Sequence, residues 1–158
     1  MKIRLYIEGG GDSALQSTQF RQGWRIFFEN AGLEGRMPAI IRGGGREDTY
    51  QDFKTAVARR KSDELPLLLV DSEELVAENT TAWAHLKNRD GWDKPTESGN
   101  EDVYLMICCM ETWFLADLES LRHHFGAEWR DNAVPAWTDL EAVPKGTIFD
   151  ALNKATAG

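Results

Sequence analysis

Two stretches of this chain are almost purely apolar, and each has the length of a single β-strand. Residues 65–70 read Leu-Pro-Leu-Leu-Leu-Val, and residues 103–110 read Val-Tyr-Leu-Met-Ile-Cys-Cys-Met. Strands covered by helices on both faces of a parallel sheet have this composition, because neither face meets water. The two runs therefore predict an α/β fold built on a parallel sheet.

The remaining sequence alternates between strand and helix patterns. Residues 3–7 and 38–41 have strand patterns, and helical spacing is found over 13–31, around Tyr50, Phe53 and Val57, over 74–87 and over 111–124. This order predicts a mostly parallel four-stranded sheet of Rossmann-like type, flanked by helices, in a single domain over residues 1–158. The tail from residue 127 is expected to hold a short helix over 148–155. It stops without a clear structural ending, which suggests a fragment of a somewhat longer protein.

The chain is acidic, and this limits the partners that it can bind unaided. It carries 26 Asp and Glu against 18 Lys and Arg, a formal net charge of −8. Proteins that bind nucleic acid alone usually have a basic surface, because phosphate contacts dominate the affinity. Here positive charge is confined to small clusters, at Arg42 and Arg46 and at residues 59–61. A polyanionic substrate would need metal ions or a partner protein to help hold it.

Neither membrane insertion nor secretion is expected. No apolar run approaches the roughly 20 residues needed to span a bilayer, and the N-terminus alternates apolar and polar residues, unlike a signal peptide. Cys108 and Cys109 are neighbours inside an apolar run, so we expect them to be reduced and buried. These features predict a cytoplasmic protein.

Acidic residues follow the predicted strands. Glu8 follows the first strand, Asp71 and Glu73 follow the third, and Glu111 follows the fourth. The carboxyl ends of parallel strands form the ligand-binding edge of such sheets, and carboxylates gathered there would repel one another without a cation. Mg²⁺ or Mn²⁺ bound by these four residues would meet that need. The alternative is that each acid caps the next helix, where the helix dipole favours negative charge.

Two glycine-rich turns lie next to these acids. Gly9 and Gly10 follow Glu8, with Asp12 or Ser13 as the expected N-cap of the next helix, and Arg42 and Arg46 flank a triple glycine. Such turns let the backbone approach a phosphate, so Gly9, Gly10, Arg42 and Arg46 are candidate phosphate-binding residues. Flexible turns without a ligand are the alternative. Trp92, in the polar stretch 88–102, is a candidate for exposed stacking on a base.

The arrangement of these motifs resembles the Toprim domain of bacterial primases, topoisomerases and related nucleases. That domain has a Glu and a glycine turn after its first strand and an Asp-x-Asp or Asp-x-Glu motif after a later apolar strand. A closer resemblance is to a small bacterial Toprim-like group, domain-of-unknown-function family 4276. It rests on the segments Ile7–Gly10, Leu69–Glu73, Met110–Asp117 and Pro144–Lys145.

The resemblance implies Mg²⁺-dependent phosphodiester chemistry. It implies that Glu8 is a general acid/base or metal ligand, that Asp71 and Glu73 bind metal, that Glu111 supports a second ion and that Asp117 shapes the site. It also implies nucleic acid as substrate and an ABC/SMC-type ATPase as partner, in phage defence or DNA maintenance. Two alternatives remain open: a non-catalytic interaction or regulatory module of the same fold, and a small-molecule phosphohydrolase.

Overall fold

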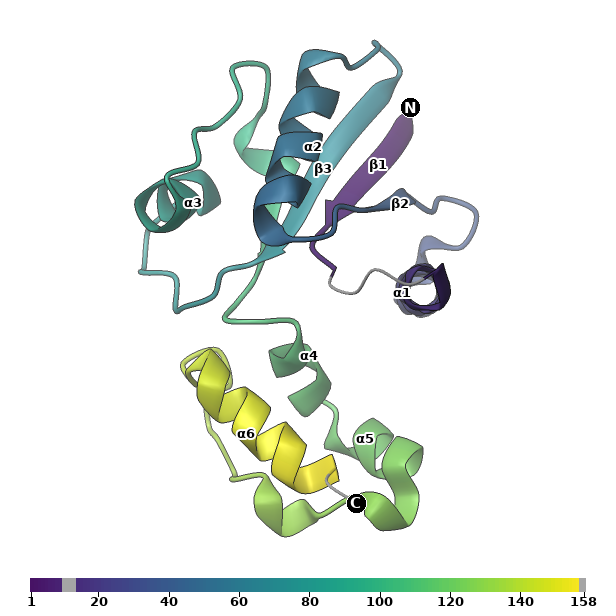
Figure 1. Ribbon diagram of the computed structural model, residues 1–158, viewed down its shortest axis with the longest axis vertical. Helices are drawn as coiled ribbons and strands as arrows, with labels where there is room; N and C mark the ends of the chain where they lie inside the picture. The colour runs from purple at the N-terminus through teal and green to yellow at the C-terminus, as the bar shows by residue number, and fades with distance from the viewer. Residues whose placement is uncertain (10–13, 157–158) are drawn as a thin grey trace. The chain divides into compact units, whose positions relative to one another are not determined.

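A computed structural model describes residues 1–9 and 14–156, and it contains the four-stranded sheet that the sequence predicts (Figure 1). The strands are β1 (Lys2–Ile7), β2 (Ala39–Arg42), β3 (Glu64–Asp71) and β4 (Val103–Met106), in the order β2-β1-β3-β4. All four run parallel, in an α/β, Rossmann-like arrangement flanked by helices. In this sheet Ile7 of β1 pairs with Arg42 on one side and with Leu69 on the other.

The chain divides into two compact units, which we describe separately. The first comprises residues 1–70 and 81–105 and contains most of the sheet. One face of its sheet packs on α2 (Arg46–Ala58) and α3 (Ala82–Asp90), which is followed by a short 3₁₀ turn over Asn100–Asp102. The core between these layers is buried and apolar, and includes Tyr6, Tyr50, Phe53, Val57, Leu68, Val70, Trp83, Leu86, Trp92 and Val103.

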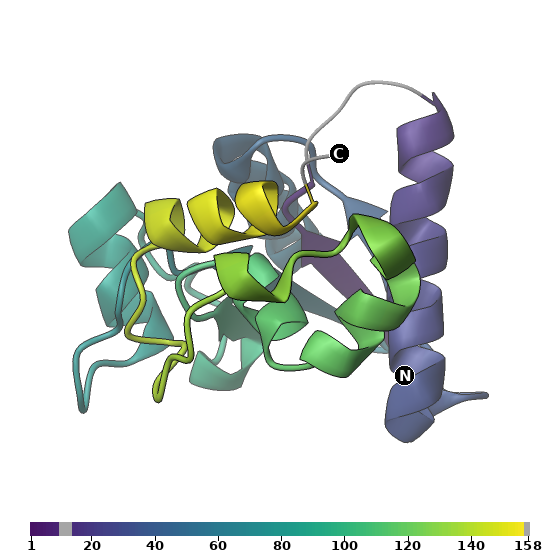
Figure 2. The ribbon, with the colours of Figure 1, turned by 90° about the horizontal axis from the view of Figure 1, so that it is seen from below.

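Helix α1 (Ala14–Phe28) carries an aromatic cluster, as its spacing predicts. It is seen end-on in Figure 1 and along its length in Figure 2, and it lies against β2. Trp24 is buried and stacks on Phe28, with 5.7 Å between the ring centroids. The helix continues as a π-helical turn over Glu29–Leu33, where Gly32 adopts a φ of 81° and supports its assignment as the C-terminal stop. The N-cap predicted at Asp12 or Ser13 lies outside the described residues.

The second unit comprises residues 71–80 and 106–158 and is helical. Its helices are α4 (Glu111–Leu115), α5 (Leu118–Phe125) and α6 (Lys145–Thr156), with 3₁₀ turns over Gly126–Glu128 and Asp131–Ala133. Its core is formed by the buried side chains of Cys109, Leu115, Val143 and Ile148. The helix predicted over 148–155 is present and begins three residues earlier, at Lys145.

Three predicted boundaries are wrong, and side-chain caps explain two of them. The helix predicted from residue 74 begins at Ala82, because the hydroxyl of Thr81 accepts the N–H of Ala84. The helix predicted over 111–124 is interrupted at Asp117, whose carboxylate accepts the N–H of Ser120 and starts α5. The fourth strand ends at Met106 rather than Met110, and Cys108 has a φ of 58°, which no strand residue adopts.

The glycine turn between β2 and α2 supplies a stability test. A Cβ on Gly43 would lie 2.3 Å from Thr49 Oγ1 and 2.5 Å from Thr49 Cα, and Thr49 is fully buried. We expect Gly43→Ala to lower the free energy of unfolding by about 1–3 kcal/mol, measured by urea denaturation.

Gly23→Ala is the matched control for this substitution. Gly23 lies inside α1, and a Cβ there would meet no atom within 4 Å. It should raise stability by about 0.5–1 kcal/mol, because alanine has the higher helix propensity. Equal effects of the two substitutions would contradict the packing described for the turn.

Candidate functional site

In the second unit, Asp71 and Glu73 converge on one cation supplied by the chain itself. The Nζ atom of Lys145 donates hydrogen bonds to Asp71 Oδ2 at 3.0 Å and to Glu73 Oε1 at 2.8 Å. The exposed fractions of the three side chains are 25% for Lys145, 12% for Asp71 and 19% for Glu73. Two largely buried carboxylates, at the last residue of β3 and two residues after it, therefore share the single positive charge of the ammonium group.

The turn after β3 is held by a compact hydrogen-bond network. Buried Ser72 donates its hydroxyl to the carbonyl of Glu74 at 2.6 Å and accepts the N–H of Cys108 at 2.8 Å. The N–H groups of Ser72 and Glu73 donate to the carbonyls of Met106 and Cys108. Glu73 takes up a φ of 68°, a conformation that is uncommon for a residue with a side chain. The position of the Glu73 carboxylate is therefore set by a backbone with an unfavourable φ, which the hydrogen bonds of Ser72 and Glu73 hold in place.

A second backbone contact fixes the other carboxylate. Asp71 Oδ1 accepts the N–H of Met110 at 3.0 Å, so each oxygen of Asp71 has a donor. Lys145 is the first residue of α6, directly after Pro144, whose carbonyl accepts the N–H groups of Thr147 and Ile148. A cation at this end of a helix is opposed by the helix dipole, and the two carboxylates offset that cost.

The pKa of Lys145 reflects these contacts. Burial lowers the pKa of the amine, but the hydrogen bonds and negative charges of Glu73 and Asp71 outweigh it, and the net pKa is raised above its ordinary value. Lys145 is therefore charged throughout the neutral range. Its Nζ also lies 5.6 Å from the centre of the Phe149 ring, within the range of a cation–π contact.

Glu111 was expected at the end of the fourth strand, and Asp117 was expected to help shape the site. Because β4 ends at Met106, Glu111 is the first residue of α4, where its charge suits the helix dipole. Asp117 is the N-cap of α5: its Oδ1 and Oδ2 accept the N–H and hydroxyl of Ser120 at 3.0 and 2.6 Å. These hydrogen bonds lower the pKa of Asp117. The position of Glu111 corresponds to the capping alternative, and the metal-binding role of Glu111 and the supporting role of Asp117 stay predictions.

In the first unit, Glu8 is held by Arg46 at the start of α2. Arg46 Nη1 donates to Glu8 Oε2 at 3.3 Å. The same guanidinium forms a two-pronged contact with Asp90, at the end of α3, with distances of 3.0 Å from Nε and 2.8 Å from Nη2. Arg46 therefore links the end of β1 to α2 and α3. It was predicted to bind phosphate, and in the structure its guanidinium contacts the carboxylates of Glu8 and Asp90.

Asp90 completes this cluster and was not among the predicted site residues. Burial raises the pKa of its carboxyl group, but the hydrogen bonds and charge of Arg46, followed by the charge of Arg89, outweigh this effect and lower it overall. Beneath the guanidinium lies the Trp92 ring, 4.9 Å from Arg46 Cζ, and this ring stacks on Tyr50 at 4.4 Å. The expectation that Trp92 is exposed is wrong: its exposed fraction is 4%, because the indole fills the space between α2 and α3.

The two glycine turns contact each other. The N–H of Gly9 donates to the carbonyl of Gly44 at 3.0 Å, and Arg42 Nε donates to the carbonyl of Gly9 at 3.2 Å. Arg42 also donates to the hydroxyl of Ser17 in α1. Arg42 thus ties the two turns to α1, and its proposed contact with phosphate stays a prediction. Gly10, the other predicted phosphate-binding glycine, lies outside the described residues.

The predicted site residues therefore form two groups, one in each unit. Glu8 lies with Arg46 and Asp90, whereas Asp71 and Glu73 lie with Lys145. Within residues 1–9 and 14–156, no three His, Cys, Asp or Glu side chains gather closely enough to hold a metal ion. Neither Lys145 nor Asp90 was assigned a role from the sequence. The signal for Lys145 was the resemblance of the Pro144–Lys145 segment to the family, and Asp90 had none.

Two simpler expectations can be compared directly with the structure. Cys108 and Cys109 are buried and not paired in a disulfide, as predicted, and burial raises the pKa of both thiols. None of the helices in the described part of the chain is both long and apolar enough to cross a membrane.

The sheet and its flanking helices define the protein as an α/β protein of Rossmann-like arrangement. The chain belongs to the family described as Domain of unknown function (DUF4276), which matches residues 7–153 and so includes Glu8, Asp71, Glu73 and Lys145. This confirms the family indicated by the sequence motifs. No curated protein and no solved structure matches the chain.

The bridge from Lys145 to the two carboxylates can be tested by Lys145→Met, which keeps the length of the side chain and removes its charge. We expect the variant to lose roughly 2–3 kcal/mol of stability near pH 8, because it removes the positive charge that the largely buried Asp71 and Glu73 carboxylates share. The raised pKa means that the contribution of Lys145 is fully present below the unfolded value of about 10.4 and is lost as the pH rises through the higher folded value.

Urea denaturation of both proteins between pH 7 and strongly alkaline pH measures this difference. The gap between wild type and Lys145→Met should close only above about pH 10.5. Lys154→Met, at an exposed position of the same helix, is the control and should change stability by less than about 0.5 kcal/mol. A gap that closes near neutral pH would contradict the charge assignment.

The Arg46–Asp90 contact predicts that the stability of the protein depends on pH in the acidic range. Asp90→Asn should cost about 2–3 kcal/mol above pH 5, because it removes the charge from a largely buried two-pronged pair. Since the folded pKa of Asp90 is lowered, its contribution is present above the unfolded value of about 3.9 and is lost as the pH falls through the folded value. The gap in unfolding free energy should therefore close only below pH ~4.

Asp93→Asn is the control for Asp90→Asn. Asp93 pairs with Lys87 at 2.7 Å, but its side chain is 78% exposed. An exposed pair of this kind contributes at most about 1 kcal/mol. An equal loss in both variants would show that burial of the Arg46–Asp90 pair has no energetic importance.

Proposed function

We propose that this protein is the subunit of a Mg²⁺-dependent nuclease of Toprim type, which hydrolyses phosphodiester bonds. The observation that carries the proposal is the convergence of Asp71 and Glu73 on a single positive charge at the end of β3. Two carboxylates that hydrogen-bond one ammonium group face a common point, from which both could bind one divalent ion. Their oxygens are the type of donor that Mg²⁺ and Mn²⁺ prefer.

The residues present fit such an ion in their chemistry. Asp71 and Glu73 would hold it, and Mg²⁺ commonly takes one or two carboxylates and completes its shell with water and substrate phosphate. When bound, the ion would polarise the phosphate and lower the pKa of a coordinated water molecule. In this proposal Glu8 acts as general acid/base or ligand, Glu111 supports a second ion and Asp117 positions the segment after α4.

Lys145 has a defined role in the proposal. Its ammonium group offsets part of the negative charge of Asp71 and Glu73, and it would compete with a divalent cation for the same oxygens. When it leaves the carboxylates, Lys145 offers three N–H donors and a positive charge to a phosphate oxygen. The raised pKa of this residue supports the role, because it keeps the group charged at the pH of the reaction.

A partner protein is part of the proposal because the chain's own positive charge is limited. The net charge is −8, and Arg42, Arg46 and Lys145 already contact acceptor groups of the chain. Electrostatic attraction of nucleic acid therefore requires another surface. We propose an ABC/SMC-type ATPase as that partner, in bacterial defence or DNA maintenance, with nucleic acid as the shared substrate.

A second candidate function is favoured by one specific observation. Since Arg46 and Lys145 neutralise the acids without any ion, the same arrangement could serve a non-catalytic interaction or regulatory module. In that case the ion pairs are purely structural. A small-molecule phosphohydrolase is the third alternative, and it would require no basic surface.

Cleavage assays with purified protein test the first proposal. Plasmid, single-stranded DNA and RNA are incubated with Mg²⁺ or Mn²⁺, with and without the candidate ATPase. We expect cleavage that falls by about 100-fold or more in Glu8→Gln and Asp71→Asn, because they remove a proposed acid/base and a proposed ligand. Glu74→Gln, exposed and next to the pair, is the matched control and should cleave normally. Cleavage that survives in Glu8→Gln and Asp71→Asn would refute the assignment of the site.

Calorimetry with Mn²⁺ separates the nuclease from the non-catalytic module. Wild-type protein should bind the ion and Asp71→Asn should not. Lys145→Met should bind it at least ~10-fold more tightly, because one nearby positive charge is removed. No binding to wild type or to Lys145→Met would favour the structural module, and cleavage of a small phosphate ester without cleavage of nucleic acid would favour the third alternative.

A further inference from the structure

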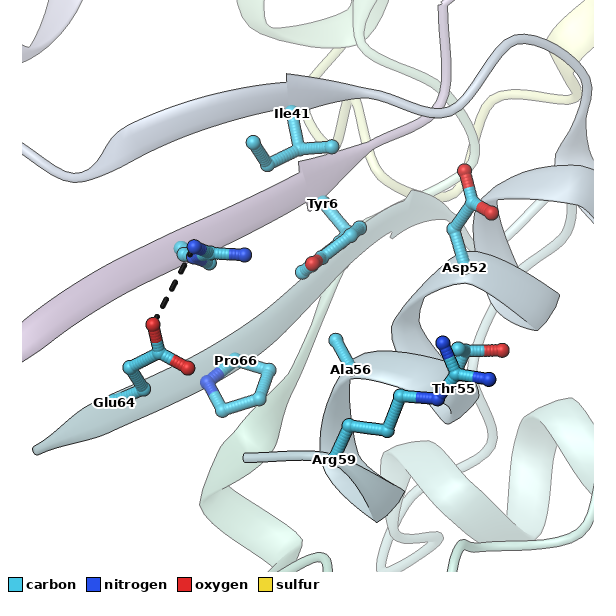
Figure 3. A pocket seen from close by; sticks show the side chains of 9 residues that line it. Tyr6, Ile41, Asp52, Thr55, Ala56, Arg59, Glu64 and Pro66 are labelled. Atoms are coloured by element: carbon cyan, nitrogen blue, oxygen red, sulfur yellow. Dashed lines mark ion pairs between the residues drawn. The ribbon is translucent and has the colours of Figure 1, made fainter. Parts of the chain in front are cut away.

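The first unit contains a cavity of about 390 Å³ between helix α2 and the sheet (Figure 3). Its apolar wall is formed by Tyr6, Ile41, Ala56 and Pro66. Figure 3 shows these side chains between the strands and the helix, with charged side chains around them. The volume lies within the range of about 300–1,000 Å³ that is usual for small-molecule sites.

The side chain of Tyr6, which is largely buried, lines this cavity. The exposed fraction of Tyr6 is only 6%, and its ring is fixed by an edge-on contact with Phe53 at 6.3 Å. Its hydroxyl has no hydrogen-bond partner among residues 1–9 and 14–156, whereas the hydroxyl of Tyr50, equally buried, donates to the carbonyl of Asp93 at 2.7 Å. Because no fully enclosed side-chain oxygen in the described chain lacks a partner, the Tyr6 hydroxyl must reach the space of the cavity.

Four charged side chains line the cavity, and two of them have no partner among the described residues. Arg4 and Glu64 pair with each other, with Nη2 and Oε1 3.4 Å apart, at the end of the cavity where β1 and β3 begin. Asp52 and Arg59 also line the cavity, and neither side chain has an ion pair or hydrogen bond to any described residue. Asp52 lies within α2 and Arg59 is the C-cap residue directly after it, so the two charges line the helical side of the cavity seven positions apart in sequence.

We propose that this cavity binds a small zwitterionic organic molecule with an apolar body between its two charges. Its carboxylate contacts the guanidinium of Arg59, its ammonium group contacts the carboxylate of Asp52, and its body lies on Ile41, Ala56 and Pro66. A simple anion is disfavoured by the carboxylate of Asp52, and a simple cation is disfavoured by Arg59. The Tyr6 hydroxyl supplies one directional hydrogen bond to the ligand.

The proposed ligand does not depend on the nuclease chemistry. The Glu8 and Arg46 side chains do not line the cavity, and neither do Asp71, Glu73 or Lys145. Binding here is therefore a separate property, and it can exist whether or not the protein cleaves nucleic acid. The failure of either proposal leaves the other intact.

Three probes of similar size distinguish the ligand class: 4-(aminomethyl)benzoate is a zwitterion, 4-methylbenzoate an anion and benzylamine a cation. Each is titrated into ¹⁵N-labelled full-length protein, and the dissociation constants are taken from the amide shifts around Tyr6 and Ala56. The zwitterion should bind with a constant of roughly 1 mM, as expected for a fragment, and at least about fivefold more tightly than the other two probes.

Variants then assign the contacts. Tyr6→Phe and Arg59→Gln should each weaken the zwitterion at least about threefold, whereas Arg60→Gln, which alters the next residue outside the cavity, should not. The amide spectrum of each variant reports whether it is folded. Equal binding of the zwitterion and the anion, or an equal loss in Arg59→Gln and Arg60→Gln, would refute the proposed charge matching. Absence of shifts around Tyr6 in wild-type protein at roughly 10 mM probe would refute the site itself.

Discussion

Carboxylates that are withdrawn from water next to a parallel sheet need a positive partner, and this requirement organises both units of the protein. In the first unit Arg46 reaches from the start of α2 to Glu8 and Asp90, and so joins a strand and two helices. In the second unit Lys145 fixes the start of α6 against the segment that follows β3. Removal of either cation would take away positive charge that offsets the desolvation of these carboxylates, which costs more than the pairing itself contributes. Two of the chain's basic side chains, Arg46 and Lys145, therefore constrain the fold.

The sheet could be predicted because its determinants are local. The apolar run over 65–70 and the alternation over 3–7 were sufficient to place β3 and β1, and the intervening helical spacing required parallel strands with crossover connections. Boundaries that depend on one hydrogen bond were predicted less well. Thr81 and Asp117 each start a helix by accepting a backbone N–H, and neither lies within an obvious capping motif. The end of β4 depends on Cys108, whose left-handed backbone is stabilised by contacts to Ser72 and Glu141 that are distant in sequence.

The candidate site was also only partly predictable, because its acids lie in local motifs whereas their partners are distant in sequence. Glycine turns and acids after the strands indicated where chemistry could occur, and the family followed from those motifs. The partners of the acids could not be predicted, because Lys145 lies 74 residues after Asp71, and Arg46 lies 44 residues before Asp90. Only the tertiary structure brings them together. From the acidic residues alone, a bound metal ion is the simplest inference. The structure shows in addition that Arg46 and Lys145 form ion pairs with these carboxylates.

Lys145 and a divalent ion would bind the same carboxylate oxygens, and this competition affects any reaction at Asp71 and Glu73. A divalent ion that binds Asp71 and Glu73 must displace or share the contacts of Lys145, so its affinity is lower than that of a pair of free carboxylates. An incoming phosphate changes the balance, because it adds ligands for the ion and an acceptor for the released ammonium group at once. Ion and phosphate would then bind cooperatively, and neither would occupy the site well alone. In the proposed nuclease, whose chain has a net charge of −8, this coupling would confine activity to conditions in which a partner has already delivered the polyanion.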